Sequence, residues 1–145
     1  MVEVTLTDGT KMQIEGERVV RIRRTGPIES PHGVTRIDWK IVSYVMEEPG
    51  EVADLVRDEL SNPATLAKLD TPGLGPVWFS GPKSQGPIPV PKEWQTDGVV
   101  SSLYIGNSLQ YVGNSPEVVY DVLEKAGGDL VPIKSHKTHF WDAEV

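Results

Sequence analysis

The chain has 145 residues, enough for one ordinary domain or two very small ones, and a formal net charge of −7 at pH 7. It contains no cysteine, which excludes disulfides, thiolate metal sites and cysteine nucleophiles. The negative charge disfavours nucleic-acid polymers, the N-terminus is no signal peptide, and no apolar run approaches the roughly 20 residues of a membrane helix, so we expect a cytoplasmic protein with no membrane contact.

The first elements in the chain are predicted to be strands. Residues 2–7 alternate apolar and polar side chains, as a half-buried strand does, and Asp8-Gly9 after them is a strong hairpin signal. Further strands are predicted at 11–14, 19–24, 34–39 and 41–46. The last of these is apolar enough to predict a central position in a sheet.

Proline marks the start of both predicted helices, because its missing N–H needs no partner there. Pro49 precedes an apolar stripe that ends at Leu60, and Pro116, capped by Asn114 or Ser115, precedes one that ends at Ala126. The remaining elements are predicted as a short helix at 63–69, a linker at 70–75, a strand at 77–79, a loop at 80–98 and a hairpin of strands at 99–105 and 109–112.

Two halves of the chain repeat the same order of residues. Tyr44, Pro49 and Val52 are followed by Tyr111, Pro116 and Val119, each 67 positions further on (116 minus 49). The stretch Gly-Pro-Ile also occurs twice, at 26–28 and 86–88, and is predicted to extend the repeat upstream. A strand pair with one helix buries too little surface to be stable alone, so two copies are expected to share a core.

The repeat predicts an α+β fold. We expect two diverged copies of a β-hairpin-plus-helix unit, mainly antiparallel sheet, with two principal short helices. The predicted organisation is a single domain over 1–145, with a first half at 1–69, a second half at 76–127 and a C-terminal tail at 128–145.

Three segments of the first half carry a family resemblance. They are the strand and turn from Val4 to Gly9, the strand from Val19 to Ile22, and the strand from Ser43 to Met46 that leads into a helix at Glu51. Together these segments resemble the FlbD/SwrD-like family of small flagellar-associated proteins. The resemblance implies a small β-rich protein with one helix and no known catalysis.

The candidate catalytic and metal-binding residues lie in the tail. His136 and His139 precede Asp142 and Glu144, and histidine with carboxylate can bind a divalent metal. The two histidines share a face on a helix but not on a strand, and helix signals are weak here, so we expect neither a metal nor a cofactor. We expect the apolar pair Phe140 and Trp141 to contact a neighbouring subunit.

A ligand site is predicted on the loops that contain Gly-Pro-Ile and on the arginines of the third strand. Proline stiffens these loops, tryptophan can line a groove, and arginine neutralises anions. The predicted ligand-binding residues are Arg21, Arg23, Arg24, Pro27, Ile28, Pro87, Ile88 and Trp94. Alternatively, the loops pack across their own sheet, with Ile28 and Ile88 as buried plugs.

The leading functional hypothesis is a non-catalytic binding protein that acts as a homo-oligomer. Its ligand is expected to be a small anionic, nucleotide-like molecule, by analogy with phage proteins that sequester such signals. One alternative is a structural or adaptor protein that binds only protein partners. A second alternative is a hydrolase that uses His136 or His139.

Overall fold

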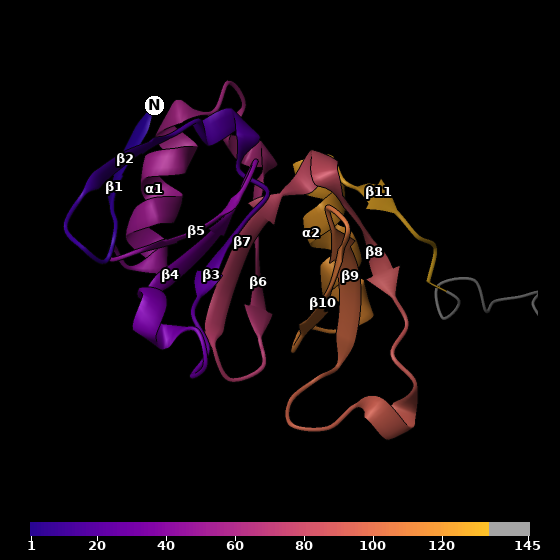
Figure 1. Cartoon of the computed structure of the whole chain (residues 1–145). Helices are drawn as coiled ribbons and strands as arrows, with labels where there is room; N and C mark the ends of the chain where they lie inside the picture. The colour runs from indigo at the N-terminus through magenta and orange to yellow at the C-terminus, as the bar shows by residue number, and fades with distance from the viewer. Residues whose placement is uncertain (134–145) are drawn as a thin grey trace, which may run out of the picture.

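The computed structural model describes residues 1–133 and confirms an α+β fold of mainly antiparallel strands with two helices (Figure 1). A separate hairpin pairs β1 (Val2–Thr5) with β2 (Lys11–Ile14). A five-stranded sheet runs in the order β5 (Val42–Val45), β4 (Thr35–Asp38), β3 (Arg21–Arg24), β7 (Gly75–Ser80) and β6 (Leu66–Thr71). A four-stranded sheet runs in the order β10 (Ser108–Val112), β9 (Ser101–Ile105), β8 (Ser84–Ile88) and β11 (Asp129–Leu130).

Each helix follows a group of strands and starts at a proline, as predicted. The helix α1 (Pro49–Glu59) buries Val52 and Val56, which its apolar stripe contributes to the core. The helix α2 (Pro116–Ala126) is capped by the Ser115 hydroxyl, which accepts a hydrogen bond from the Val118 N–H, and it ends at Gly127 in the left-handed conformation. Within residues 1–133, no helix is long and apolar enough to cross a membrane.

The molecule has two hydrophobic cores, which lie between successive layers of the strands and helices drawn in Figure 1. The first is enclosed by the hairpin β1–β2, by α1 and by one face of the five-stranded sheet, and includes Val4, Ile14, Ile22, Ile37 and Val56. The second lies between the other face of β6 and β7, the helix α2 and the four-stranded sheet, and includes Leu69, Phe79, Leu103, Val112 and Leu123. The hairpin β6–β7 therefore contributes to both cores, since Trp78 belongs to the first and Phe79 to the second.

Two similar units are visible in the strand pairing of the two hairpins. The pairs Val2–Ile14 and Val4–Met12 in β1–β2 recur as Ala67–Phe79 and Leu69–Val77 in β6–β7, each 65 positions later (67 minus 2). We call β1 to α1 the first unit and β6 to β11 the second unit. The hairpin of the second unit pairs with β3 of the first unit, so it completes the sheet of its neighbour.

Three hydrogen bonds before each helix repeat as well. In the first unit, the Thr5 N–H donates to Glu47 Oε1 (2.9 Å), the Met46 N–H donates to the Thr5 carbonyl (2.8 Å), and the Thr35 hydroxyl donates to the Glu47 carbonyl (2.5 Å). The second unit has the same three bonds, from Asp70 N–H to Asn114 Oδ1 (2.7 Å), from Gly113 N–H to Asp70 O (2.8 Å), and from Ser101 Oγ to Asn114 O (2.6 Å). These bonds align the two units independently of the hydrophobic pattern.

Several predicted elements between the helices are wrong. Residues 63–65 form one 3-10 turn, but the predicted helix at 63–69 and the linker at 70–75 are largely the strand β6 and its turn into β7. The predicted loop at 80–98 contains the strand β8. Pairing with β3 and β9 stabilises these strands in spite of their glycines and prolines.

Two further predictions are corrected by the sheet order. The strand β5 lies at the edge of the five-stranded sheet, not at its centre. The two Gly-Pro-Ile stretches are not equivalent, because residues 26–28 form a turn and residues 86–88 lie in β8. In the second unit Gly86 lies against Leu103, and in the first unit Ile22 pairs with Ile37 in the same way. Residues 86–88 therefore correspond to β3 and not to the turn at 26–28.

Candidate functional site

The face of the five-stranded sheet that points away from α1 is divided into two halves. Over β6 and β7 it is apolar and packs into the second core. Over β3, β4 and β5 it is mainly charged and polar, because alternation along each strand puts five charged or polar side chains there beside the apolar Val42. These side chains are Arg21, Arg23, Arg36, Asp38, Val42 and Tyr44.

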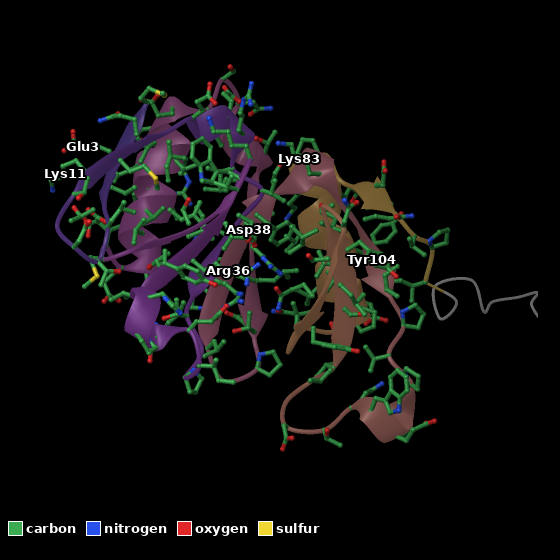
Figure 2. The ribbon with its side chains drawn as sticks, in the orientation of Figure 1. Glu3, Lys11, Arg36, Asp38, Lys83 and Tyr104 are labelled. Atoms are coloured by element: carbon green, nitrogen blue, oxygen red, sulfur yellow. The ribbon has the colours of Figure 1, made fainter. Side chains whose placement is uncertain are left out.

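Five charged side chains on this half form one hydrogen-bonded chain, which we call the arginine cluster: Arg21, Arg23, Arg36, Glu29 and Asp38 (Figure 2 labels Arg36 and Asp38). Glu29 accepts hydrogen bonds from Arg23 Nη1 (2.8 Å) and Nη2 (3.1 Å) and from Arg36 Nη1 (3.1 Å). Asp38 accepts from Arg21 Nε (2.7 Å) and Arg36 Nε (2.9 Å). Three guanidinium groups thus face two carboxylates, which leaves one positive charge in excess.

Glu29 is the most perturbed acid in the cluster. The hydrogen bond from Arg23 lowers the pKa of Glu29 to about 2, aided by the Gly26 N–H and by Arg36 and opposed by partial burial. For Arg36, burial lowers the pKa, but its bonds to Asp38 and Glu29 outweigh burial and raise the pKa above its usual value. Both shifts favour the charged forms of Glu29 and Arg36 at neutral pH.

Arg21 connects the cluster to the second unit. Its side chain is only 9% exposed, and its Nη1 donates to Gln110 Oε1 on β10 (2.8 Å). The bonds of Arg21 and Arg36 use Nε and Nη1, and no residue within 1–133 accepts from Nη2 of either side chain. These are strong donors, and at Arg21 the donor is also poorly hydrated.

Two rings flank the charged side chains. The ring of Tyr44, the cross-strand neighbour of Arg36, lies 5.4 Å from the ring of His32 at an interplanar angle of 34°. Aromatic side chains beside arginine provide both a flat apolar surface and a positive charge. The arrangement is therefore suited to ligands that combine an anionic group with a ring.

The structure brings together only part of the predicted site. Arg21 and Arg23 lie on one face, as alternation predicted, but Arg24 lies on the other and pairs with Glu48 (2.5 Å). Pro27 and Ile28 lie in the turn next to Glu29, so this loop does border the cluster. Ile28 is 91% exposed, and the alternative in which it plugs a core is wrong.

The other predicted residues belong to the second unit. Pro87 and Ile88 lie in β8, and Trp94, which is 61% exposed, lies in the loop between β8 and β9. Pro87 and Ile88 are thus in a different sheet from the arginine cluster, although the loop between β8 and β9 and the loop between β3 and β4 lie at the same end of the molecule in Figure 1. Phe140, Trp141, His136 and His139 lie outside the described residues.

The prediction missed six residues of the site: Glu29, His32, Arg36, Asp38, Tyr44 and Gln110. Alternation in 35–38 puts Arg36 and Asp38 on one face, and this signal was available. Glu29 lies in a turn and Gln110 in the second unit, so only the folded chain places them beside the arginines. In residues 1–133, no group of three or more His, Asp or Glu side chains is placed to hold a metal ion.

A separate cavity of about 280 Å³ lies where the end of α1 meets the second unit. Its walls are mainly apolar, with Val19, Val56 and Leu60 among them, and Lys83 at its rim. Glu17 also lines it, but its carboxylate accepts bonds from the Ser61 hydroxyl and N–H (both 2.8 Å), which lower the pKa of Glu17. The cavity therefore offers fewer converging donors than the arginine cluster.

Comparison with known proteins gives no relative. No protein-family model matches the chain, and neither a curated protein nor a solved structure matches it. The resemblance of the first half to the FlbD/SwrD-like family therefore stays a prediction from sequence. What the fold and the site define is a class: a two-unit α+β protein with a charged, partly buried half-face on its larger sheet.

Proposed function

We propose that this chain is a non-catalytic binding protein that takes up a small anionic ligand at the arginine cluster and acts as a homo-oligomer. The observation that supports the ligand is the positive charge in excess at a partly buried cluster on a protein with a net charge of −7. Long-range attraction does not explain a cationic group here, since the overall field repels anions. A local site that selects by geometry fits better.

The cluster is preorganised for binding. Glu29 and Asp38 hold the guanidinium of Arg36 from two sides, so its conformation is fixed before any ligand arrives. A ligand that accepts from Nη2 of Arg36 and Arg21, which no residue within 1–133 uses, would bind with little loss of side-chain entropy in the protein. Because each guanidinium presents planar donors, carboxylate and phosphate oxygens are the natural acceptors.

Among small anions, the rings of His32 and Tyr44 favour nucleotide-like ligands, which have a ring as well as a phosphate. A phosphate at Arg36 would leave a base or sugar beside Tyr44, its neighbour across β4 and β5. Base stacking on an aromatic side chain contributes about 1–3 kcal/mol. Ring and phosphate recognition together would favour a nucleotide over inorganic phosphate.

A specific observation also favours the alternative role, in which the chain binds a protein partner. The edge strand β5 and its flanks expose Ile41, Val42 and Met46, and this stretch of six residues from 41 to 46 has no charged side chain. Exposed, uncharged edge strands accept an additional strand readily. A peptide partner at this edge would leave the arginine cluster unoccupied.

Thermal stability in the presence of ligand tests the proposed function. Inorganic phosphate and a panel of linear and cyclic nucleotides are added to the full chain, and the Tm is measured. A ligand at 100 times its Kd stabilises the folded state by about 2.7 kcal/mol, so we expect at least one nucleotide to raise the Tm by several degrees. Phosphate alone should raise it less.

Variants locate the site. Arg36→Ala should abolish the rise in Tm, whereas Arg57→Ala, which removes an exposed arginine from α1, should retain it. Circular dichroism shows whether each variant is folded before ligand is added. If no nucleotide raises the Tm of the wild-type chain at millimolar concentration, or if Arg36→Ala responds as the wild type does, the anionic-ligand proposal is wrong.

A further inference from the structure

The stacked layers of the molecule end in two surfaces of opposite character. At one end lies the outer face of the hairpin β1–β2, with Glu3 and Lys11, and at the other lies the outer face of the four-stranded sheet, with Tyr104 (Figure 2). We call the latter the outer sheet face. Its exposed residues are Gln85, Tyr104, Leu109 and Tyr111, with the buried Ser102 between the strands and Asp129 beside Gln85 at the β11 edge.

The hairpin end is built for contact with water. In the internal hairpin β6–β7, Trp78 lies on the face that points away from α2, and this face is buried in the first core. The equivalent residue in β1–β2, 65 positions earlier (78 minus 65), is Gln13, which is exposed and donates to Glu3 Oε1 (3.2 Å). Terminal units of repeat proteins carry such polar outer faces because no further unit covers them.

On the outer sheet face, charged residues of the first unit are replaced by uncharged ones. The cross-strand pair Arg21–Asp38 of the first unit corresponds to Gln85–Tyr104, and the pair Arg36–Tyr44 corresponds to Ser102–Tyr111. The face that borders the second unit therefore has five charged side chains, while its counterpart on β8, β9 and β10 has none, and Asp129 beside Gln85 at the β11 edge is charged. A solvated end would be expected to be the more polar of the two.

The large side chains of the outer sheet face are exposed to solvent and lie next to one another. Tyr104 is 40% exposed, Leu109 is 41% exposed and Tyr111 is 39% exposed. Tyr104 and Leu109 form a direct cross-strand pair, so they make one continuous patch. Exposed tyrosine and leucine in one patch are typical of a protein interface.

We propose that the outer sheet face is the contact between two copies of this chain, related by a two-fold axis that packs the two faces together. A second copy offers two end surfaces, and its hairpin end is charged and polar, which leaves its own outer sheet face as the complement. The patch formed by Tyr104, Leu109 and Tyr111 is uncharged, so it adds no repulsion of its own between two acidic chains. At the rim, Lys83 and Asp129 carry opposite charges, so a two-fold arrangement brings attraction between copies within reach.

A two-fold contact also closes the assembly, because each copy covers the outer sheet face of the other. This inference rests on the homo-oligomer part of the proposed function and names its interface. It does not depend on the anionic ligand, since the arginine cluster lies on a different sheet.

Solution mass is the first test. Light scattering of the full chain should give about twice the 15.9 kDa of one copy. Tyr104→Lys should give a mass close to that of one copy, because two lysines would be buried against an apolar face. Leu55→Lys, which changes an exposed leucine on α1, should leave the dimer mass unchanged, and circular dichroism checks that both variants fold.

Cross-linking provides a second measurement that does not require loss of the contact. The chain has no cysteine, so Leu109→Cys and Leu55→Cys each introduce a single thiol. A short bis-maleimide should link two copies of the Leu109 variant and should not link the Leu55 variant. This comparison reports the position of the interface, even if Tyr104→Lys fails to fold.

Three outcomes would overturn the inference: a wild-type mass of one copy at tens of micromolar, an unchanged dimer in folded Tyr104→Lys, or equal cross-linking of both thiol variants.

A chain that ends at Ile133 separates this interface from one made by Phe140 and Trp141. It should remain a dimer, and a single-copy mass for it would assign the contact to those residues instead. Monomeric Tyr104→Lys should still respond to nucleotide, so failure of the ligand proposal and failure of the dimer are distinguishable.

Discussion

Glu29 is the residue on which the geometry of the arginine cluster depends most. Its two carboxylate oxygens join Arg23 on β3 to Arg36 on β4, and one of them also accepts from the Gly26 N–H (3.0 Å). Because Glu29 lies in a turn, these bonds also fix the turn against the sheet. A single side chain thus anchors a loop and orients two guanidiniums.

Glu29→Gln should lower the free energy of unfolding at pH 7 by on the order of 1–3 kcal/mol, because hydrogen bonds from arginine to a carboxylate exceed those to an amide. The pKa of Glu29 is about 2 in the folded chain, against an ordinary value of 4.5. Its stabilising effect is therefore complete above about pH 4.5 and is lost as the pH falls toward 2. Urea unfolding at several pH values measures this.

The variant should accordingly show a weaker loss of stability between pH 5 and pH 2 than the wild type. Glu48→Gln is the matched control, since Glu48 is 63% exposed and pairs with Arg24 on the opposite face. A surface pair of this kind contributes little, so the control should follow the wild-type curve. An acid dependence in Glu29→Gln equal to that of the wild type would contradict the assignment.

At this scale, the sequence predicted the facing of side chains but not their partners. Period-two alternation correctly separated Arg21 and Arg23 from Arg24. It carried no information on Glu29, because a turn has no fixed period, or on Gln110, which approaches Arg21 from 89 residues away. Contacts between distant segments depend on packing that local patterns do not encode.

Among the elements, each unit has a short 3-10 turn whose first residue is a glycine packed on the end of the helix. Gly16 lies against Glu59 in the first unit, and Gly81 lies against Ala126 in the second. Both pairs are equivalent, since Glu59 and Ala126 end α1 and α2. The close approach of turn and helix is thus a shared feature of the units and requires a residue without a Cβ.

Gly81→Ala should destabilise the chain more than Gly16→Ala. A Cβ at residue 81 would lie 2.1 Å from the Ala126 carbonyl oxygen, so backbone must move, whereas at residue 16 it would lie 2.8 Å from the Glu59 Cβ. We expect a loss of roughly 2–4 kcal/mol for the first and about 1 kcal/mol for the second, measured by urea unfolding.

Gly50→Ala serves as the control for these two substitutions. A Cβ there meets only Trp78, at an ordinary 3.8 Å, so the stability should not fall. Equal effects of the substitutions at residues 16 and 81 would show that the turn of the second unit adjusts more easily than its geometry indicates.

Both helices and most strands were predictable because their signals are local: proline at the start, an apolar stripe, and alternation. The strands β6 and β8 were not, and β7 was predicted only over its central residues 77–79, because Pro76 and the pair Gly86-Pro87 read as loop residues. Pairing on both sides compensates for them, since β7 lies between β3 and β6. Strand formation there is a property of the sheet rather than of the segment.

At the scale of the whole molecule, the hairpin β6–β7 links the two cores. Trp78 and Phe79 are consecutive residues, yet they belong to different cores because a strand alternates its faces. The two units therefore share an element rather than meeting at a surface, which favours cooperative unfolding.

Leu123→Ala tests this cooperativity. Leu123 is fully buried in the second core, and its truncation should cost about 2–5 kcal/mol. In a chain that carries Trp94→Phe and Trp141→Phe, the remaining Trp39 and Trp78 report on the first core, and unfolding followed by their fluorescence should show the same loss of stability to urea as the far-ultraviolet circular dichroism. Leu55→Ala, an exposed position, should shift neither signal appreciably.

If fluorescence keeps its wild-type midpoint in Leu123→Ala while circular dichroism changes, the units unfold independently. The prediction of one domain from residue 1 to residue 145 would then have to be replaced by two. Sequence alone supported a shared core by the small size of each unit, but it did not identify the hairpin that provides it.

The pairing of β3 with β7 has a consequence during protein synthesis. A chain emerges from the ribosome N-terminus first, so residues 21–24 are available long before residues 75–80. Until then, the first unit has an open strand edge, to which a neighbouring nascent chain can add its own hairpin. That hairpin follows about fifty residues downstream, so slow translation through residues 60–80 prolongs the time for which the edge is open. Such slowing should increase the exchange of hairpins between chains on one polysome.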